Sequence, residues 1–290
     1  MIITNELKVV NNTQYNQDIR ENFVSILESI VEHIIQEKNI FHLEDFSAIY
    51  YDEFTLKTNC HEEIYNTLYL EIDQPNNYKP TKIITKKNKD NFIHFPELYY
   101  PLESFKQDLY DYIMKTLDSN NIVWLDEYSI CIKSVVNVDD KPLTYYYRII
   151  PCLTYYNPNN TRGIIYKKNN GIEIEYPEKS IQNFSKKNKA TKNLYRDIVL
   201  IFKNLLLKEK NIKTLPREII EIMLYNVPNE LIKDDKISTM LNIINYVRNN
   251  SIKQFKTLDE EDFAFTSKYR SLSLIYVKHI LKILEKQLTA

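Results

Sequence analysis

Glycine is almost missing from this sequence, which has only Gly163 and Gly171 in 290 residues. A phosphate-binding loop of the Walker or Rossmann type needs several glycines close together, because the backbone must approach the phosphates. Two widely separated glycines cannot build such a loop. The sequence therefore excludes P-loop NTPases and dinucleotide-binding proteins of the Rossmann type.

Cysteine is also scarce, with only Cys60, Cys131 and Cys152 and no CxxC pair. An odd number of scattered cysteines predicts reduced thiols in the core and not a disulfide or zinc framework. Charged Glu6 and Lys8 precede any long apolar run, which argues against a signal peptide. No stretch approaches the roughly 20 apolar residues that cross a bilayer. We expect a cytoplasmic protein without a membrane partner.

An excess of charge of either sign is absent as well, since the formal net charge is −1. No global field would attract the protein to nucleic acid, so a polyanion site must be local. No two histidines have the HxH or HxxxH spacing that is typical of metal sites. No serine is flanked by the glycines of the nucleophile turn found in α/β-hydrolases. The 43% of hydrophobic and 27% of charged residues are typical of a globular protein.

Apolar periodicity divides the chain into a strand-rich first part and a helical second part. Residues 17–38 repeat apolar side chains at three- and four-residue steps, which predicts a long amphipathic helix. Further helices are expected at 102–119, 189–210, 216–225, 237–249 and 259–287. Strands are expected at 46–56, 66–73, 128–138 and 143–156, with a hairpin around 162–176.

This order of elements implies an α+β protein with two lobes. We expect a core lobe of helix and sheet over residues 1–177 and a helical lobe over 178–290. Residues 74–96 are polar and contain three prolines, which predicts a long surface loop. Its cluster Lys79–Lys89 suits RNA or DNA contacts, although a charged loop without a ligand is the simpler interpretation.

Two acidic residues end the second expected strand, in the run LYLEID. Glu71 and Asp73 are two positions apart, so alternation places both carboxylates on one face of the strand. Such a pair suits Mg²⁺ or Mn²⁺, which favour carboxylate and phosphate oxygens. The alternative is two solvated acids at a strand end.

Basic residues form a stripe on the helix expected from about Lys189. Lys189, Lys192, Arg196 and Lys203 fall together beside its apolar face at 100° per residue. A stripe of this kind can reach phosphates. The alternative is a solvated lysine face.

The second half of the chain resembles the bacterial cGAS/DncV-like nucleotidyltransferases (CD-NTases), of the DNA polymerase β-like superfamily. The resemblance rests on EIEYPEKSIQNFSKKNKATKNLYRDIVLIFKN at Glu173–Asn204 and PREIIEIMLYNVP at Pro216–Pro228. It implies a polymerase β-like core with a mixed or antiparallel sheet, plus a C-terminal helical lobe, and nucleoside triphosphates bound between them. It also implies Glu71 and Asp73 as catalytic metal ligands, with Lys187, Lys189, Lys192, Arg196 and Lys203 on the nucleotide.

Active members of the family use a Gly-Ser turn and a third Asp beside the acidic pair, and this chain departs from both patterns. The turn is expected around Leu56–Asn59, which reads LKTN, and the third carboxylate position is taken by Arg148 in the run RIIP. A guanidinium in place of a metal-binding carboxylate reverses the local charge. In another register, Asp52, Glu53, Asp139 or Asp140 would supply the missing ligand.

The resemblance therefore implies a nucleotide-binding protein of an antiviral signalling type, with impaired or altered synthesis of an oligonucleotide messenger. If it is active, it is a Mg²⁺- or Mn²⁺-dependent nucleotidyltransferase. The alternative is an inactive pseudoenzyme that binds a nucleotide or RNA, or that serves as a subunit for a protein partner in a defence system.

Overall fold

The computed structural model describes residues 13–38, 45–51, 63–73, 101–117, 121–138, 141–157, 159–168, 171–207, 218–265 and 274–289. These residues fall into two compact units. The sheet unit is the described part of the chain up to Glu178, and the helical unit is the described part from Lys179 onward. The α+β class expected from the sequence is confirmed.

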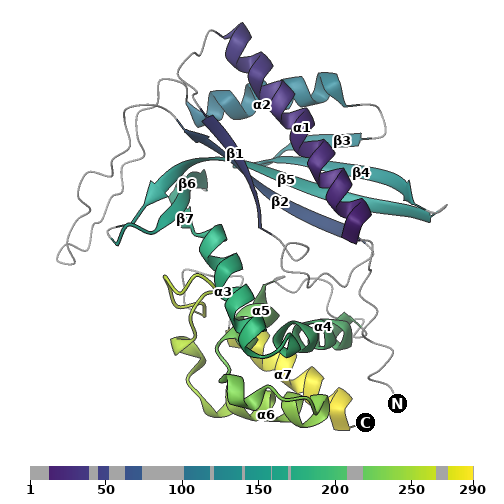
Figure 1. Cartoon of the computed structure of the whole chain (residues 1–290), viewed down its shortest axis with the longest axis vertical. Coiled ribbons are helices and arrows are strands. Elements are labelled where there is room, and N and C mark those ends of the chain that lie inside the picture. Colours follow the sequence, from purple (N-terminus) through teal and green to yellow (C-terminus); the bar gives the residue numbers. More distant parts are fainter. Residues whose placement is uncertain are drawn as a thin grey trace. The chain divides into compact units, whose positions relative to one another are not determined.

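The sheet unit contains two helices and a seven-stranded sheet (Figure 1). Its helices are α1 (Thr13–Glu37) and α2 (Leu102–Thr116). Its strands are β1 (Asp45–Tyr50), β2 (Glu63–Asp73), β3 (Asn121–Leu125), β4 (Ile130–Val138), β5 (Lys141–Tyr156), β6 (Arg162–Lys168) and β7 (Gly171–Glu175).

The strand order is β1-β2-β5-β4-β3, and β6 pairs with the far end of β5 and with β7. The β2–β5 pair is parallel, whereas the other pairs are antiparallel. The sheet is therefore mixed. The expected strands at 66–73, 128–138 and 143–156 and the hairpin around 162–176 correspond to β2, β4, β5 and β6–β7.

Helices α1 and α2 pack on one face of this sheet (Figure 1). Phe23 of α1 stacks on Tyr147 of β5, with ring centroids 4.1 Å apart. Tyr145 and Ile149 lie on the same face and are buried with them. Because side chains alternate along a strand, Tyr146 and Arg148 lie on the opposite face, which α1 and α2 do not cover. We call this the open face.

The helical unit contains most of α3 (Pro177–Ala190), then α4 (Leu194–Leu207), α5 (Ile219–Tyr225), α6 (Lys236–Asn249) and α7 (Leu274–Thr289), with two short 3₁₀ turns at Asn229–Leu231 and Ile252–Gln254. Helices α5 and α6 match the sequence expectation closely. Their apolar side chains, together with those of α4, form a buried core.

The single helix expected at 189–210 is wrong, because the chain forms α3 and α4 with a break between them. Lys192 and Asn193 have positive φ angles of 52° and 72°. Side chains stabilise the break: Thr191 Oγ1 accepts from Tyr195 N at 3.1 Å, and Asn188 Oδ1 accepts from Arg196 N at 3.0 Å. Polar side chains thus replace the helical bonds at the first turn of α4.

Two other expectations differ from the structure. Strand β3 was not expected, because its five residues are too short and too exposed to show a clear period. The last helix begins at Leu274 and not at 259, since Thr257–Asp262 forms a turn in which Glu260 has a φ of 61°. The expected loop at 74–96 lies outside the described residues.

Candidate functional site

Glu71 is held in a buried polar cluster near the end of β2. The residue is 2% exposed. Thr154 of β5 donates a hydrogen bond to its Oε1, and Arg162 of β6 forms an ion pair with its Oε2. A buried carboxylate without partners is costly, so these two donors account for the burial of Glu71.

Arg162 connects two carboxylates. Its Nη2 contacts Glu71, and its Nη1 donates to Glu178 Oε1 at 2.7 Å. The Arg162 side chain is 35% exposed, whereas that of Glu71 is 3% exposed. The guanidinium therefore contacts Glu71 in the interior and Glu178 at the surface. It neutralises the charge of Glu71, which the sequence predicts as a metal ligand.

A second carboxylate, partly buried, is held nearby. The hydroxyls of Tyr69 and Tyr166 both donate to Glu175, one to each carboxylate oxygen. Burial raises the pKa of Glu175, although these two hydrogen bonds act in the opposite direction. Cys152, opposite Glu71 in the ladder, is a buried free thiol whose pKa is raised by burial and by the charge of Glu71. Such a thiol is unreactive.

Arg148 does not lie beside Glu71. In the parallel ladder, Arg148 is opposite Thr67, whereas Glu71 is opposite Cys152. Four residues along a strand correspond to roughly 13 Å. Arg148 instead contacts Tyr128, with Nη1 3.4 Å from its hydroxyl, and approaches Asp126 at 3.9 Å. The predicted convergence of Arg148 with the Glu71 carboxylate is not present.

Several predicted residues lie outside what the structure describes. Asp73 ends β2 opposite Asp45, but its side chain is not described. Asp52, Glu53 and the segment Leu56–Asn59 lie outside the described residues, as do Lys79–Lys89 and the pair Asp139 and Asp140. Their roles stay predictions.

In the described part of the chain, no three His, Cys, Asp or Glu side chains gather as metal ligands. Two-cation chemistry needs carboxylates that both cations share. Glu71 is the described member of the predicted pair, and a hydroxyl and a guanidinium contact its two oxygens. The described donors therefore do not fit a two-cation centre.

Lys187 of α3 supports the fold of the helical unit. Its ammonium donates to the Val227 carbonyl at 2.5 Å and to Asn229 Oδ1 at 3.1 Å. It also lies 5.7 Å from the ring centres of Tyr195 and Tyr225. Burial lowers the pKa of Lys187 to about 8. This lysine holds the end of α5 against α3.

Lys203 is buried in α4, where it forms an ion pair with Glu221 of α5. The side chains are 6% and 0% exposed. The interpretation of a four-residue basic stripe on one helix face is therefore wrong. The helix break separates Lys189 from Arg196, and the apolar face of α4 includes Lys203.

Three of the predicted cations remain at the surface of the helical unit. Lys189 lies in the last turn of α3 and Lys192 in the break, and both are exposed. Arg196 is half-buried and lies 3.7 Å from Asp197. These three residues are the predicted phosphate contacts that are available to a ligand.

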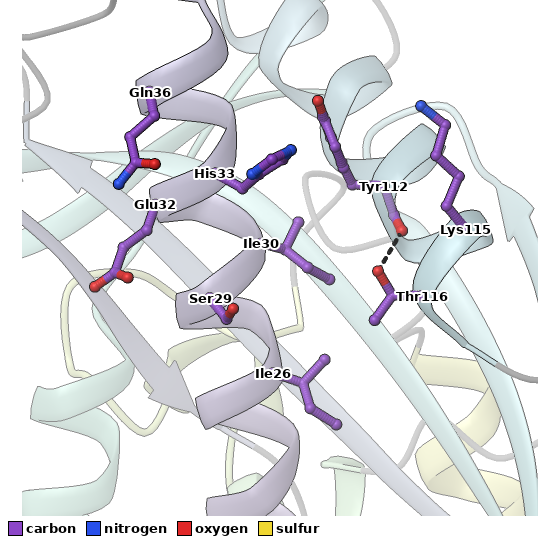
Figure 2. A pocket seen from close by; sticks show the side chains of 9 residues that line it. All are labelled: Ile26, Ser29, Ile30, Glu32, His33, Gln36, Tyr112, Lys115 and Thr116. Carbon is purple, nitrogen blue, oxygen red and sulfur yellow. Dashed lines mark hydrogen bonds between the residues drawn. The ribbon is translucent and has the colours of Figure 1, made fainter.

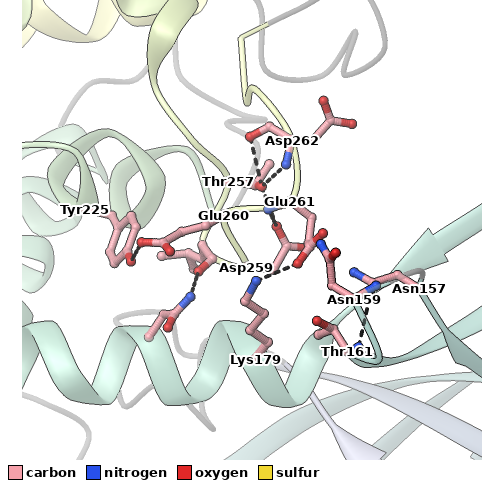
Figure 3. Close-up of polar contacts among 12 residues, drawn as sticks. Asn157, Asn159, Thr161, Lys179, Tyr225, Thr257, Asp259, Glu260, Glu261 and Asp262 are labelled. Carbon is pink, nitrogen blue, oxygen red and sulfur yellow. Dashed lines mark hydrogen bonds and ion pairs between the residues drawn. The ribbon is translucent and has the colours of Figure 1, made fainter. Parts of the chain in front are cut away.

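The helical unit also contains an ordered polar turn (Figure 3). Tyr225 donates to Glu260, Lys179 donates to Glu261 at 2.6 Å, and Thr257 donates to Asp259. Asn226 bonds to the backbone of Lys256, through Oδ1 at 2.7 Å and Nδ2 at 2.9 Å. The NVP segment of the family pattern thus has a structural role.

A separate groove of about 530 Å³ lies between α1 and α2. Figure 2 shows its lining: Ile26, Ser29, Ile30, Glu32, His33, Gln36, Tyr112, Lys115 and Thr116. None of the predicted site residues lines it. It is therefore distinct from the Glu71 cluster.

Sequence reasoning found Glu71 but missed the residues that hold it. A Glu inside an apolar strand requires a polar partner, and this was a usable signal. The signal could not identify Arg162 or Thr154, because both contacts depend on strand register.

No helix in the described part of the chain is long and apolar enough to span a membrane.

Comparison with known proteins supports the resemblance. Residues 182–283 match the family model of the cGAS/DncV-like nucleotidyltransferase C-terminal helical domain. No curated protein matches the chain.

Solved structures share the fold. Rhodothermus marinus CdnE c-UMP-AMP synthase, with Apcpp and Upnpp, matches with a TM-score of 0.66, 18% identity and 84% of each chain covered. Elizabethkingia meningoseptica CdnE cyclic dinucleotide synthase, with GTP and Apcpp, matches with a TM-score of 0.61 and 17% identity, over 92% of this chain and 89% of that one. The E. coli MS115-1 CdnC:HORMA-deltaN complex matches with a TM-score of 0.53 and 12% identity, over 94% and 82%.

At these identities the structural likeness shows the fold alone, and the model match assigns residues 182–283 to the helical domain of the family. The predicted resemblance is confirmed to this extent: the chain carries the C-terminal helical domain of the cGAS/DncV-like nucleotidyltransferases and shares the fold of solved CdnE structures.

Proposed function

We propose that this protein is a nucleotide-binding CD-NTase in which Arg162, and not a divalent cation, neutralises Glu71, so that synthesis of an oligonucleotide messenger is impaired or altered. The observation that carries the proposal is the buried Glu71–Arg162 ion pair. In active relatives, metal-bound carboxylates activate the attacking hydroxyl. A carboxylate engaged by a guanidinium and a hydroxyl is a poor ligand for a cation.

Nucleotide binding is supported by the family and by exposed cations. The R. marinus and E. meningoseptica synthases were solved with nucleoside triphosphates or their analogues. In this chain Lys189, Lys192 and Arg196 are the predicted phosphate contacts at the surface of the helical unit. We assign them the triphosphate of a bound nucleotide, since Lys and Arg donors suit phosphate oxygens.

The wider role that we propose is in antiviral signalling. A related structure from Capnocytophaga granulosa is described as a STING-associated c-di-GMP synthase, and the CdnC structure contains a HORMA protein. We extend to this chain the expectation of a signalling role and of a protein partner. Glu71 and Asp73 are the residues that would hold Mg²⁺ or Mn²⁺ in an active form.

Thermal unfolding with each NTP, with and without Mg²⁺, tests the binding part. A ligand at 100 times its Kd stabilises the folded state by about 2.7 kcal/mol. We expect a rise in Tm that does not require Mg²⁺ and that the variant Lys189→Ala/Lys192→Ala loses. Lys236→Ala, another lysine of the helical unit, is the matched control and should keep the rise. Absence of a rise with all four NTPs would refute nucleotide binding.

Incubation with four radiolabelled NTPs and Mg²⁺ or Mn²⁺ tests the catalytic part. We expect little or no product, whether or not Asp73→Asn is introduced. Rapid product formation that is lost in Glu71→Gln and Asp73→Asn, but kept in the surface control Glu285→Gln, would overturn impaired catalysis. Such a result would leave nucleotide binding intact and identify a working synthase.

A further inference from the structure

The open face of the sheet carries aromatic and basic side chains in adjacent rows. Residues that are paired between neighbouring strands lie side by side on one face of the sheet. The register of the strands therefore shows which residues form a row across the sheet. Tyr65 of β2 is opposite Tyr146 of β5, which is opposite Lys133 of β4. Lys133 is in turn opposite Ile122 of β3. This row therefore crosses four strands.

The contacts within the row are well ordered. The rings of Tyr65 and Tyr146 are stacked, with centroids 4.5 Å apart and planes within 10°. Lys133 Nζ lies 5.7 Å from the Tyr146 ring centre. A pair of aromatic rings with a cation beside it thus spans three strands, a combination found on surfaces that bind both phosphates and bases.

The next row repeats this chemistry. Thr67, Arg148, Cys131 and Trp124 are opposite one another on β2, β5, β4 and β3. Arg148 lies over the ring of Tyr128 at 5.8 Å. Lys168 also lies over that ring, at 5.0 Å, from the adjoining hairpin. Two cations therefore flank one aromatic ring.

Two side chains of the second row are accessible to a ligand, whereas Cys131 between them is buried. Trp124 is 41% exposed and the Arg148 side chain is 47% exposed. The Asp126 carboxylate lies 3.9 Å from Arg148, which is a loose contact near the limit for an ion pair. A phosphate can therefore compete for the Arg148 guanidinium.

We propose that these two rows bind single-stranded RNA, with a base stacked on Trp124 and phosphates neutralised by Lys133, Arg148 and Lys168. Stacking on aromatic side chains beside a basic track is the usual chemistry of single-strand recognition. RNA is favoured over DNA because Tyr65, Thr67 and Tyr146 place hydroxyls along the rows, where a ribose 2′-OH finds partners.

The two rows lie further along the same face than Glu71. On β2, Tyr65 and Thr67 are six and four residues from Glu71, which corresponds to roughly 20 and 13 Å. The inference uses none of the residues proposed to bind NTPs. Failure of either proposal can therefore be recognised without the other.

The single tryptophan of the chain provides a direct readout. Full-length protein is titrated with single-stranded oligo-uridine and oligo-adenosine RNA while Trp124 fluorescence is recorded. We expect saturable quenching as bases stack on the indole. Anisotropy of a labelled RNA gives the same Kd, and it also allows Trp124 variants to be measured.

Substitutions on the rows should weaken binding in characteristic ways. Trp124→Ala should raise the Kd by about 5- to 150-fold, the range for one lost base stack. Lys133→Ala should raise the Kd and reduce the salt slope by about 0.7. Lys256→Ala is the matched control, because Lys256 also lies over an exposed ring, that of Phe263 in the helical unit, at 4.0 Å. It should leave the Kd unchanged.

Three results would overturn the proposal. The first is a lack of quenching and of anisotropy change with either RNA at low salt. The second is binding that Trp124→Ala, Lys133→Ala and Arg148→Ala all leave unchanged while circular dichroism shows folded protein. The third is equal or tighter binding of the matching DNA, which would exclude the assignment to RNA.

Discussion

Lys203 and Glu221 form an ion pair inside the helical unit, with side chains that are 6% and 0% exposed. Removing one partner of such a pair leaves a buried charge without compensation. We predict that Lys203→Met lowers the free energy of unfolding by about 3–5 kcal/mol. Urea denaturation of the purified variant measures this change.

The double variant Lys203→Met/Glu221→Leu separates lost charge from lost packing. It should recover most of the stability, because apolar side chains of similar size can replace a buried ion pair. Arg248→Ala, which breaks the exposed pair with Glu285, is the control and should change stability little. If Lys203→Met has no larger effect than this control, the buried pair is not present in solution.

Arg162 should stabilise the sheet unit through Glu71. We predict that Arg162→Gln lowers the free energy of unfolding by about 1–3 kcal/mol, less than for a buried pair because the Arg162 side chain is 35% exposed. Adding Glu71→Gln should restore part of the loss, since the uncompensated carboxylate is then removed. Additive effects in this double-mutant cycle would contradict the contact.

The lowered pKa of Lys187 leads us to predict that stability depends on pH. Its pKa is lowered to about 8, below the value of about 10.4 in an unfolded chain, because burial disfavours the ammonium. Above pH 8 the unfolded chain binds more protons at this site than the folded one does, so stability rises with pH. The contribution of Lys187 should therefore increase between pH 8 and about 10.

Comparison with Lys187→Met isolates this contribution. Denaturation across that pH range should show a smaller rise in the variant than in the parent protein. Tyr195 and Tyr225, whose pKa values are raised chiefly by burial, act in the opposite direction above pH 10. The measurement should end below that pH. Parallel profiles for parent and variant would refute the lowered pKa of Lys187.

Gly163 is required at a close approach between β6 and the end of β7. A Cβ there would lie 2.7 Å from the Glu175 carbonyl and 2.7 Å from the Tyr176 ring. We predict that Gly163→Ala lowers stability by about 1–3 kcal/mol, as overpacking does. Gly171→Ala is a natural control, because its Cβ would meet only the Lys168 carbonyl, at 3.3 Å. Equal melting temperatures for the two variants would contradict this prediction.

Local sequence patterns predicted the elements but not their contacts. The apolar repeats of α1, α2 and α6 and the β-branched runs of β4 and β5 were sufficient to place those elements. The break between α3 and α4 was missed because it depends on hydrogen bonds of Asn188 and Thr191, which apolar periodicity does not report. The residues around Glu71 were missed because strand register decides them.

The family motif correctly indicated the helical domain, but three residues that it suggested for the site have other contacts in the structure. It placed Arg148 beside Glu71, although the β2–β5 register separates them by four residues. It assigned Lys187 and Lys203 to a ligand, whereas their ammonium groups bind the protein itself. For the two lysines, a charged residue of the family pattern contributes to packing, and sequence alone does not distinguish that role from ligand binding.

The parallel pairing of β2 with β5 has a consequence for folding. Glu63 is opposite Thr144, so about 80 residues must be synthesised before this pair can form. Long-range strand pairing slows folding, because closing a large loop costs entropy before any contact compensates it. During translation β2 would remain without its central neighbour, and its apolar side chains would be open to aggregation or to a chaperone until β5 emerges from the ribosome.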